Sequence, residues 1–600
     1  MDKDKFLADM RTRFKRSSEA DQDQRELALD DMRFILGGDH QWDDDSREAR
    51  RGRPVLTMNK LPKFIRQVTG DQRQNRPSIK VRPVDSGADP MLAKIMEGHI
   101  RNIEYNSMAA FAYDNAFKQA VSGGYPGSWR ILTDYSDDDS FEQDIIIAPV
   151  HNQFTVYYDP ETLHHVYHGK LAYCFITETI TQETFRRKYP KKEEGGEFDQ
   201  GAGEELEGWN LDDTRRVAEY FYTEPVTKMV YLLESGETID DRKVKEFVVE
   251  DGMGGKYLDF QDGQPPMPII RERKVKCNKV MWCKVSGSEI LEGPKEWAGK
   301  YIPVIPVFGD TWNIAGETHY KSVIRDAKDP QRVYNYMTSQ NVEMAALQPK
   351  VPYKLTPAQI EGHESQWNQL NQVAYPYVLY NPDPQAPGAP QREISAQTSS
   401  AYVQMALQAT DDMKDCTGIY DASVGQQSNE TSGRAIIARQ REGDVGMFEF
   451  IDNLTRAIQF TGKCLVDLIP KVYDTERTLR VLGPDETPEM VAVNQKKMTP
   501  DGPVLINDIT AGKYDVYVTV GPSYTTQRME SAESMMQLIQ AVPQLFAVIG
   551  DLIVKNLDWP GADEIAERLK SMQQPQQPGA MPGQPLPPEL AGGMTQQPLM

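Results

Sequence analysis

Cysteine is scarce in this chain, and long apolar stretches are missing. Five cysteines are scattered over 600 residues, at positions 174, 277, 283, 416 and 464. An odd, dispersed set gives no disulfide framework, which fits a reducing cytoplasm. No run of 18 apolar residues exists, so no membrane-spanning helix is predicted.

Positive charge is also in short supply. Lysine and arginine number 67 against 89 aspartate and glutamate residues, which gives a formal net charge of −22. Acidic surface repels DNA, so the chain is not a sequence-specific DNA reader with a large basic face. A passage through which DNA slides is compatible with this balance, because a strongly attractive wall would stall the movement.

Enzyme motifs are missing as well. No serine–histidine–carboxylate set, paired-carboxylate cleft or glycine-rich phosphate loop emerges, so we predict no enzyme, no catalytic residue and no cofactor. The segment 293–301 (GPKEWAGKY) superficially resembles a phosphate-binding loop. Its spacing is one residue too long, and Tyr301 replaces the Ser or Thr that would hold magnesium.

Metal ligands do not gather in the sequence either. The three histidines of LHHVYH (163–168) have no acidic or cysteine partner at ligand spacing, and polar surface or subunit contact is their expected role. Cys277 and Cys283 lack a second pair, which argues against a zinc ribbon. Three aspartates at 137–139 are typical of a charged loop, with a divalent-cation site as the alternative. We predict no metal site.

The length predicts several domains. Six hundred residues exceed one hydrophobic core, so we expect about three to five domains. Apolar spacing predicts helices over 3–36 and 90–123, each stopped by a pair of glycines. Between them, the basic stretch 50–85 predicts two breaks at proline, a short helix and a strand.

The apolar period changes towards two between about 128 and 310, which indicates a mixed sheet region. A stretch rich in Glu and Gly, 191–208, is expected to be an exposed loop. The candidate strands are 145–150, 154–158, 171–177, 217–222, 229–233, 274–284 and 304–308.

Helices return after residue 321. The pattern predicts a helix over 322–347, a compact β-rich insert over 348–395 and a second helix over 397–417. Residues 476–522 are strand-like, most clearly at 514–520. Further helices are expected over 525–554 and 562–572, and the Pro- and Gln-rich residues after 571 are expected to be disordered.

A very long helix is the most informative single prediction. A polar, glycine-punctuated loop over 418–433 leads into apolar residues at helical spacing from Ser432 to Ile469, which would span roughly 55 Å. Gly443 and Gly446 are candidate kinks, and Pro470 is expected to end the helix. A long core helix in a large α+β protein is one interpretation; a ring-shaped machine with a central channel is the other.

Four segments carry a family resemblance. They are GRPVLTMNKLPKFIRQVTGDQRQNRPSIKVRPVD (52–85), FEQDIIIAPVHNQFTVYYDP (141–160), TSGRAIIARQREG (431–443) and VTVGPSYTTQRMESAESM (518–535). The chain resembles the portal proteins of tailed double-stranded DNA phages, in the branch of short-tailed phages of the Salmonella-phage type. The segments are spread over most of the chain, so the resemblance covers nearly all of it.

The resemblance implies an α+β portal fold: a ring of twelve subunits with a mixed-sheet wing, a two-helix stem, a small β-rich clip, a tunnel loop and a helical crown. A long C-terminal helical barrel is not expected, because the chain ends in the Pro/Gln tail. The implied domains are N-terminal helices and wing (1–321), stem helices (322–347 and 396–417), clip (348–395), tunnel loop (418–433), long helix and wing return (434–524), crown (525–572) and disordered tail (573–600).

The resemblance also implies the function and the partners. Portal proteins form the DNA channel at one capsid vertex, and serve in genome packaging, retention and ejection. The implied partners are further copies of the chain, double-stranded DNA, the terminase motor, major capsid and scaffolding proteins, and a tail adaptor, with no membrane. The implied place is the virion, after assembly in the host cytoplasm.

Two sets of residues are candidate contacts. The tunnel loop offers amides and hydroxyls that bond transiently to phosphates, or it is simply a solvated turn; its residues are Gln426, Gln427, Ser428, Asn429, Glu430, Thr431 and Arg434. The basic N-terminal set pairs with acidic surface of a neighbouring subunit or contacts DNA. Its residues are Arg50, Arg51, Arg53, Lys60, Lys63, Arg66, Arg73 and Arg76.

Two other classes of protein stay open at this point. A tail or baseplate hub is also a ring with mixed sheets, and a ring of about twelve subunits bound to capsid protein would argue against it. A packaging nuclease-ATPase would require ATP hydrolysis and a phosphate loop.

Overall fold

A computed structural model gives two compact units, Met1–Val520 and Gly521–Met600. The residues that it describes are 2–85, 88–190, 210–211, 214–234, 238–240, 247–250, 256–258, 266–287, 289–347, 352–370, 372–392, 400–419, 447–483, 487–499, 502–521, 524–557, 561, 564–565 and 568–569. The predicted loop 191–208, residues 420–433 of the predicted tunnel loop, the kink glycines Gly443 and Gly446, and the C-terminal tail 573–600 lie outside these residues.

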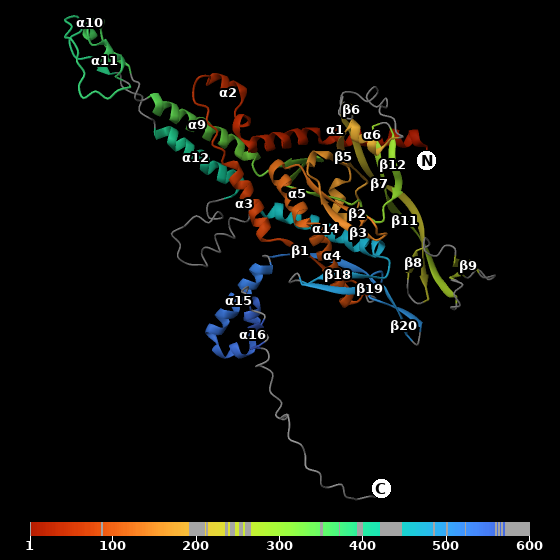
Figure 1. Cartoon of the computed structure of the whole chain (residues 1–600). Coiled ribbons are helices and arrows are strands. Elements are labelled where there is room, and N and C mark those ends of the chain that lie inside the picture. The colour runs from red at the N-terminus through yellow and green to blue at the C-terminus, as the bar shows by residue number, and fades with distance from the viewer. Residues whose placement is uncertain are drawn as a thin grey trace, which may run out of the picture. The chain divides into compact units, whose positions relative to one another are not determined.

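The first helix, α1 (Lys3–Leu36), confirms the prediction for 3–36 (Figure 1). Asp2 caps its start by accepting from the Asp4 N–H, and Gly37 ends it with φ at 79°. Near its start, Leu7, Met10 and Phe14 pack on aromatic residues of the large sheet. Near its end, Phe34 joins the main core.

Two helices replace the single helix predicted for 90–123. These are α4 (Pro90–Asn106) and α5 (Ala109–Gly123). The break lies at Met108, which has a left-handed φ of 48°. Apolar spacing continues across this break, so the sequence pattern does not reveal it. The predicted short helix and strand upstream are confirmed as α3 (Leu61–Gln74) and β1 (Pro77–Pro83).

A three-stranded sheet lies beside α4 and α5. Its order is β13-β2-β3, formed by Val304–Val307, Gly127–Tyr135 and Gln143–Pro149. The indole N–H of Trp129 on β2 donates to the Thr461 hydroxyl at 3.0 Å, and both side chains are fully buried. This bond fixes the sheet to the long helix α14.

A nine-stranded sheet contains the longest strands. Its central path runs β4 (Val156–Tyr158), β5 (Tyr173–Thr181), β7 (Thr214–Leu233), β11 (Met267–Ser286), β10 (Lys256–Leu258) and β9 (Val248–Glu250); β6 (Asn210–Leu211) and β8 (Thr238–Asp240) pair with β7, and β12 (Ile290–Glu296) pairs with β11. Two separate strands were expected at 217–222 and 229–233, and they are one strand, β7. Pro225 interrupts the sequence pattern but not the strand, because β5 pairs only as far as Tyr222, and an edge position tolerates the missing N–H.

A helix pair follows a small hairpin, β14 (Asp310–Ile314) with β15 (Glu317–Lys321). The pair consists of α9 (Lys328–Leu347) and α12 (Ser400–Thr417). The residues between them were expected to be β-rich. Their described part holds the short helices α10 (Pro357–Ile360) and α11 (Glu364–Asn368), and the strand pair β16 (Tyr353–Lys354) with β17 (Gln391–Arg392). Two short helices, the first of which is capped by Thr356, thus replace much of the expected strand. The high proline content of this stretch hides the capping signal in the sequence.

The described part of the long helix is α14 (Phe448–Val472), with twelve buried residues. Pro470 was expected to end it, but the helix continues to Val472. A proline in the last turn removes only one backbone hydrogen bond, and the Tyr473 N–H still donates to the Ile469 carbonyl. A Cβ at Gly462 would lie 2.6 Å from Val516, so α14 packs closely on the sheet of β1 and β22 (Tyr514–Val520).

The remaining strands complete the first unit as two hairpins, β18 (Arg477–Leu482) with β19 (Pro488–Val493) and β20 (Gln495–Thr499) with β21 (Gly502–Ile506). They confirm the strand-like reading of 476–522. In the second unit, α15 (Tyr524–Ala541) and α16 (Phe546–Asn556) replace the single helix predicted for 525–554, since Pro543 begins a turn of 3-10 helix. In the described residues, no helix is both long and apolar enough to cross a membrane.

Candidate functional site: the helix pair and the basic segment

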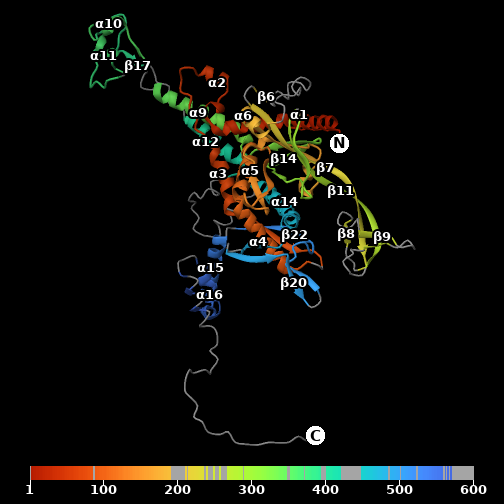
Figure 2. The ribbon, with the colours of Figure 1, turned by 45° about the vertical axis from the view of Figure 1, so that its right-hand side comes forward.

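The helices α9 and α12 lie side by side in both ribbon views (Figures 1 and 2). They are antiparallel, because the end of α12 lies beside the 3-10 turn Arg325–Ala327 at the start of α9. Several apolar side chains of the pair point outward, among them Val342 and Leu407, which is 62% exposed. A packed antiparallel pair with apolar outer surface is suited to further packing against copies of itself.

An extended segment crosses one face of α9. Residues 54–60 have neither helix nor ladder pairing, and three of their backbone N–H groups donate to α9 side chains. The N–H of Leu56 bonds to Ser339 Oγ at 2.9 Å, that of Met58 to Asn335 Oδ1 at 3.0 Å and that of Lys60 to Gln331 Oε1 at 3.1 Å. We call these three acceptors, Gln331, Asn335 and Ser339, the polar ladder. All three are fully buried.

The spacing of the polar ladder has a simple origin. Four residues along a helix rise about 6.0 Å, and two residues along an extended chain rise about 6.6 Å. Every second N–H of the segment therefore meets every fourth side chain of α9. The Asn335 amide also donates to Gln41, which in turn bonds to the Phe34 carbonyl at the end of α1. The ladder thus joins α9 to the N-terminal helix.

Arg50 is a central member of this contact rather than a free surface charge. Its side chain is 3% exposed and pairs with Glu343 at 2.9 Å. The same guanidinium donates to Gln340 and to the Pro54 carbonyl, and it lies over the Tyr336 ring. Arg53 pairs with the same Glu343. These contacts lie within one chain, where the sequence suggested a neighbouring subunit or DNA.

The other basic residues fall into separate groups. Arg73 and Arg76 both pair with Asp114. Arg51 pairs with Glu48 on the surface. The structure therefore distributes the basic segment over several contacts and does not gather it on one face.

A third group lies where α3 meets α12. The Lys60 ammonium donates to Thr410 and lies 3.9 Å from the centre of the Tyr334 ring. Lys63 and Arg66 line a cavity of about 560 Å³ together with Lys414. The cavity therefore has cationic walls from both helices.

The start of α9 is tied to α1 by buried charge. Asp31 is fully buried and accepts from the Ser322 hydroxyl at 2.6 Å and from Arg325 Nε at 2.9 Å. Lys328, the first residue of α9, pairs with the same carboxylate. A buried carboxylate with several donors holds the position of both elements, because breaking one partner leaves an uncompensated charge.

The tunnel-loop candidates, from Gln426 to Arg434, lie outside the described residues. Their flanks are described: Ile419 after α12 and Met447 before α14 are each 1% exposed. The described chain on either side of these residues is therefore anchored in the main core.

Sequence reasoning missed the polar ladder. Gln331, Asn335 and Ser339 form a stripe at four-residue spacing, which in sequence looks like a solvent face. A further signal was available in 54–60, where Pro54 and the β-branched residues Val55 and Thr57 disfavour a helix. Among the described residues, no group of three His, Cys, Asp or Glu residues could hold a metal ion. His164 instead bonds to Thr318 at 2.8 Å.

Comparisons with known proteins agree with the resemblance seen in the sequence. A family model described as "Phage P22-like portal protein" matches residues 11–600. A relative named "Portal protein", from Acyrthosiphon pisum secondary endosymbiont phage 1, is 24% identical over 590 residues. The match covers 92% of this chain and 79% of the relative. The chain belongs to the P22-like family of phage portal proteins.

Proposed function

We propose that twelve copies of this portal protein close into a ring through which double-stranded DNA enters and leaves the capsid. The helix pair α9–α12 is the stem, and the compact insert between its helices is the clip that docks the terminase motor and later the tail adaptor. The remaining assignments follow the sequence boundaries: wing (1–321 and 434–524), tunnel loop (418–433), crown (525–572) and disordered tail (573–600).

The observation that carries this assignment is the attachment of α9. The polar ladder, Arg50 and Asp31 bind α9 to the N-terminal part of the chain over most of its length, from Lys328 to Glu343, while the compact insert follows the end of the helix. A stem has to pass force between motor and wing without slipping, and buried hydrogen bonds at fixed spacing resist slipping better than an apolar contact does. This supports a rigid stem.

The ring proposal is tested by counting subunits directly. Negative-stain images of the purified protein should show top views with a central hole and twelve repeats. A stable monomer under capsid-building conditions, with no hole, would contradict the proposal. We further propose that the protein acts without catalysis, within the virion, after assembly in the host cytoplasm with capsid and scaffolding proteins; purified rings should then show no ATP hydrolysis.

We also propose that the tunnel loop grips DNA loosely. Its amides and hydroxyls bond to phosphates, Glu430 weakens the attraction and Arg434 partly restores it. Removal of 426–431 should increase DNA loss from filled heads, whereas replacement by six Gly and Ser residues separates loop length from side-chain chemistry. Unchanged retention in both variants would eliminate the idea.

Of the basic residues, we assign Arg51 and Arg66 to the acidic surface of a neighbouring subunit. Both are exposed, and copies of a chain with net charge −22 repel one another unless cations offset the repulsion. Substitution of both by Gln should slow ring formation at low salt. Equal rates would argue for the other reading, a contact with DNA.

A further inference from the structure

The turn between β2 and β3 presents an aromatic side chain to solvent. Phe141 is 99% exposed, an unusual state for a large apolar residue. The turn around it is hydrogen-bonded, because the Ser136 N–H donates to the Glu142 carbonyl at 2.8 Å and the Ser140 N–H to the Asp137 carbonyl at 3.0 Å. An ordered turn therefore holds the ring outward. We call residues 136–142 the acidic tip.

The acidic tip carries strong negative charge around Phe141. Asp137, Asp138 and Asp139 are exposed, and Glu142 pairs with Arg477 at the base of the turn. Within the described residues, the three aspartates have no ion pair. An exposed phenyl ring beside uncompensated carboxylates favours a partner with an apolar hollow and a cationic mouth.

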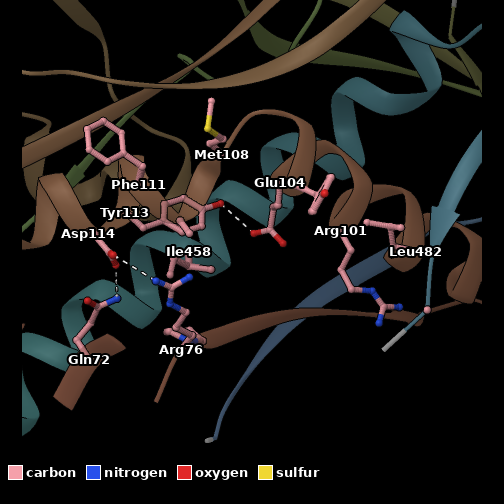
Figure 3. A pocket seen from close by; sticks show the side chains of 14 residues that line it. Gln72, Arg76, Arg101, Glu104, Met108, Phe111, Tyr113, Asp114, Ile458 and Leu482 are labelled. Atoms are coloured by element: carbon pink, nitrogen blue, oxygen red, sulfur yellow. Dashed lines mark hydrogen bonds and ion pairs between the residues drawn. The ribbon is translucent and has the colours of Figure 1, made fainter. Parts of the chain in front are cut away.

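Such a hollow lies at the junction of α4 and α5. A pocket of about 560 Å³ is lined by the end of α4, the start of α5, and residues of α3, α14 and β18. Figure 3 shows Met108 and Phe111 on one side and Ile458 at the back of the pocket. Tyr105, Met108 and Phe111 are 59%, 75% and 56% exposed, so the rim is apolar and uncovered. We call it the junction pocket.

Cationic groups outnumber their carboxylate partners around the apolar wall. Arg76 lines the junction pocket and shares Asp114 with Arg73, and Arg101 lines it and shares Glu97 with Lys80. Glu104 also lines the pocket, and Arg480 lies 5.8 Å from the centre of the Tyr105 ring.

The acidic tip cannot fill the junction pocket of its own chain. Strand β3 leads from Phe141 to Ile147, whose N–H bonds to Ser107 beside the pocket. Six strand residues at about 3.3 Å each separate the two features by about 20 Å. An acidic tip that enters the junction pocket must therefore belong to a second copy.

We propose that the acidic tip of one subunit inserts Phe141 into the junction pocket of the next. The ring packs against Met108, Phe111 and Ile458, and the aspartates lie near Arg76 and Arg101. Contact between two different surfaces of the same chain is heterologous, and it generates a closed ring when the rotation per copy divides the circle. The inference rests on the proposed function in one respect: it requires that copies of the chain meet side by side in a ring.

A cross-linking experiment tests this pairing. In a Cys416→Ser background, which removes the exposed thiol, Phe141→Cys chains and Met108→Cys chains are prepared separately. Mild oxidation of a mixture should give disulfide-linked dimers, and either variant alone should give far fewer. Dimers that form equally well from one variant alone would overturn the pairing, and so would a mixture that assembles without any cross-link.

Assembly itself provides the second measurement. Because Phe141 is exposed, Phe141→Ala should leave folding unchanged and raise the protein concentration needed for half-assembly about tenfold, which corresponds to about 1.4 kcal/mol. Trp312→Ala is the matched control, since Trp312 is also an exposed aromatic on a hairpin. Replacing Asp137, Asp138 and Asp139 by Asn should weaken assembly at low salt and have little effect at high salt.

The outcomes separate this inference from the ring itself. If the unchanged protein forms rings and Phe141→Ala forms them equally well, the tip-to-pocket contact is wrong while the ring stands. If the unchanged protein forms no rings under the same conditions, the proposed function fails first. Binding of isolated capsid protein that disappears with Phe141→Ala, with rings intact, would assign the tip to another partner and overturn the inference.

Discussion

Two ionisable residues on α4, the buried His99 and the half-buried Glu104, should have opposite effects on stability as pH changes. Burial raises the pKa of Glu104 to about 7, while the Tyr113 hydroxyl, which donates to it at 3.0 Å, and Arg101 act in the other direction. Burial lowers the pKa of His99 to about 4. The folded protein thus keeps a proton on Glu104 and keeps one off His99. Their effects on stability run in opposite directions over much of the same pH range.

Glu104→Gln should stabilise the protein above neutral pH. Between the ordinary value of 4.5 and about 7, an unfolded glutamate is ionised while Glu104 stays protonated, so its stability contribution falls as pH rises through this window. Glutamine still accepts from Tyr113 and does not ionise. Because Glu104 faces a water-accessible pocket, we expect a gain on the order of 1 kcal/mol at pH 8 and none at pH 4.

Urea unfolding at pH 4, 6 and 8 measures this change, with the surface variant Glu48→Gln as the control. A Glu104→Gln protein that is less stable at pH 8 would mean that the ionised carboxylate stabilises the fold.

His99→Phe should make the stability of the fold less sensitive to acid. A histidine whose folded pKa is depressed contributes stability above the ordinary value of 6.5, and this contribution is lost as pH falls towards 4, because only the unfolded chain takes up the proton. Phenylalanine keeps the edge contact with Tyr473, whose ring centre lies 4.5 Å away. Between pH 7 and pH 4, the free energy of unfolding should fall by on the order of 2 kcal/mol less in the variant than in the parent.

Thermal unfolding at pH 7, 5 and 4 tests this expectation, with exposed His40→Gln as the matched control. An unchanged pH profile in the His99→Phe protein would show that another group controls the acid response.

At the scale of the element, the polar ladder makes α9 depend on a segment more than 270 residues away in sequence. Asn335→Ala should destabilise the fold by about 1–3 kcal/mol, since the Met58 N–H would lose its acceptor and the buried Gln41 Oε1 would lose its donor. Ser339→Ala should act in the same direction, because it removes the acceptor of the Leu56 N–H. Val333→Ala, at a half-exposed position of the same helix, is the control.

Amide hydrogen exchange gives the specific signature of that change. Loss of the ladder should speed exchange at Leu56 and Met58, while exchange in β2 stays as it was. A uniform increase over the whole unit would indicate general destabilisation, and the ladder would then not be a local attachment.

The presence of most helices and strands could be predicted from the sequence. Their ends could be predicted only where a local residue sets them. Gly37 ends α1 at the predicted place because its φ is positive. Met108 breaks a helix at a residue with no turn preference, next to Ser107, whose hydroxyl accepts from the Ile147 N–H of β3. Pro225 and Pro470 were read as interruptions, and each is tolerated because of its place at a sheet edge or in a last helical turn.

The candidate site was less predictable than the fold. Its basic residues were identified, but their partners lie far away in sequence: Arg50 meets Glu343, and Lys60 meets Thr410. No periodicity encodes such pairs. The exposed state of Phe141 was equally hidden, because an aromatic residue after a polar turn looks like the start of a buried strand.

At the scale of the whole chain, an early strand and a late strand close the first unit. β1 pairs antiparallel with β22 along seven residues each, from Pro77 opposite Val520 to Pro83 opposite Tyr514. The helix α14 covers this two-stranded sheet through Gly462. The main core therefore needs the chain up to Val520, and the second unit begins directly after it.

A chain that ends at Val520 should fold, and one that ends at Ala511 should not fold stably. The first truncation keeps β22 and leaves the main core intact, because the described apolar cluster of the second unit, Val554 with Leu569, is separate from that core. The second removes β22 and exposes Ile79, which is 1% exposed in the intact protein. Calorimetry should show the main transition of the 1–520 chain within a few degrees of the full chain and a loss of cooperative unfolding in the 1–511 chain. If both truncations melted like the full chain, the pairing of β1 with β22 would contribute little, and the first unit would close by other contacts.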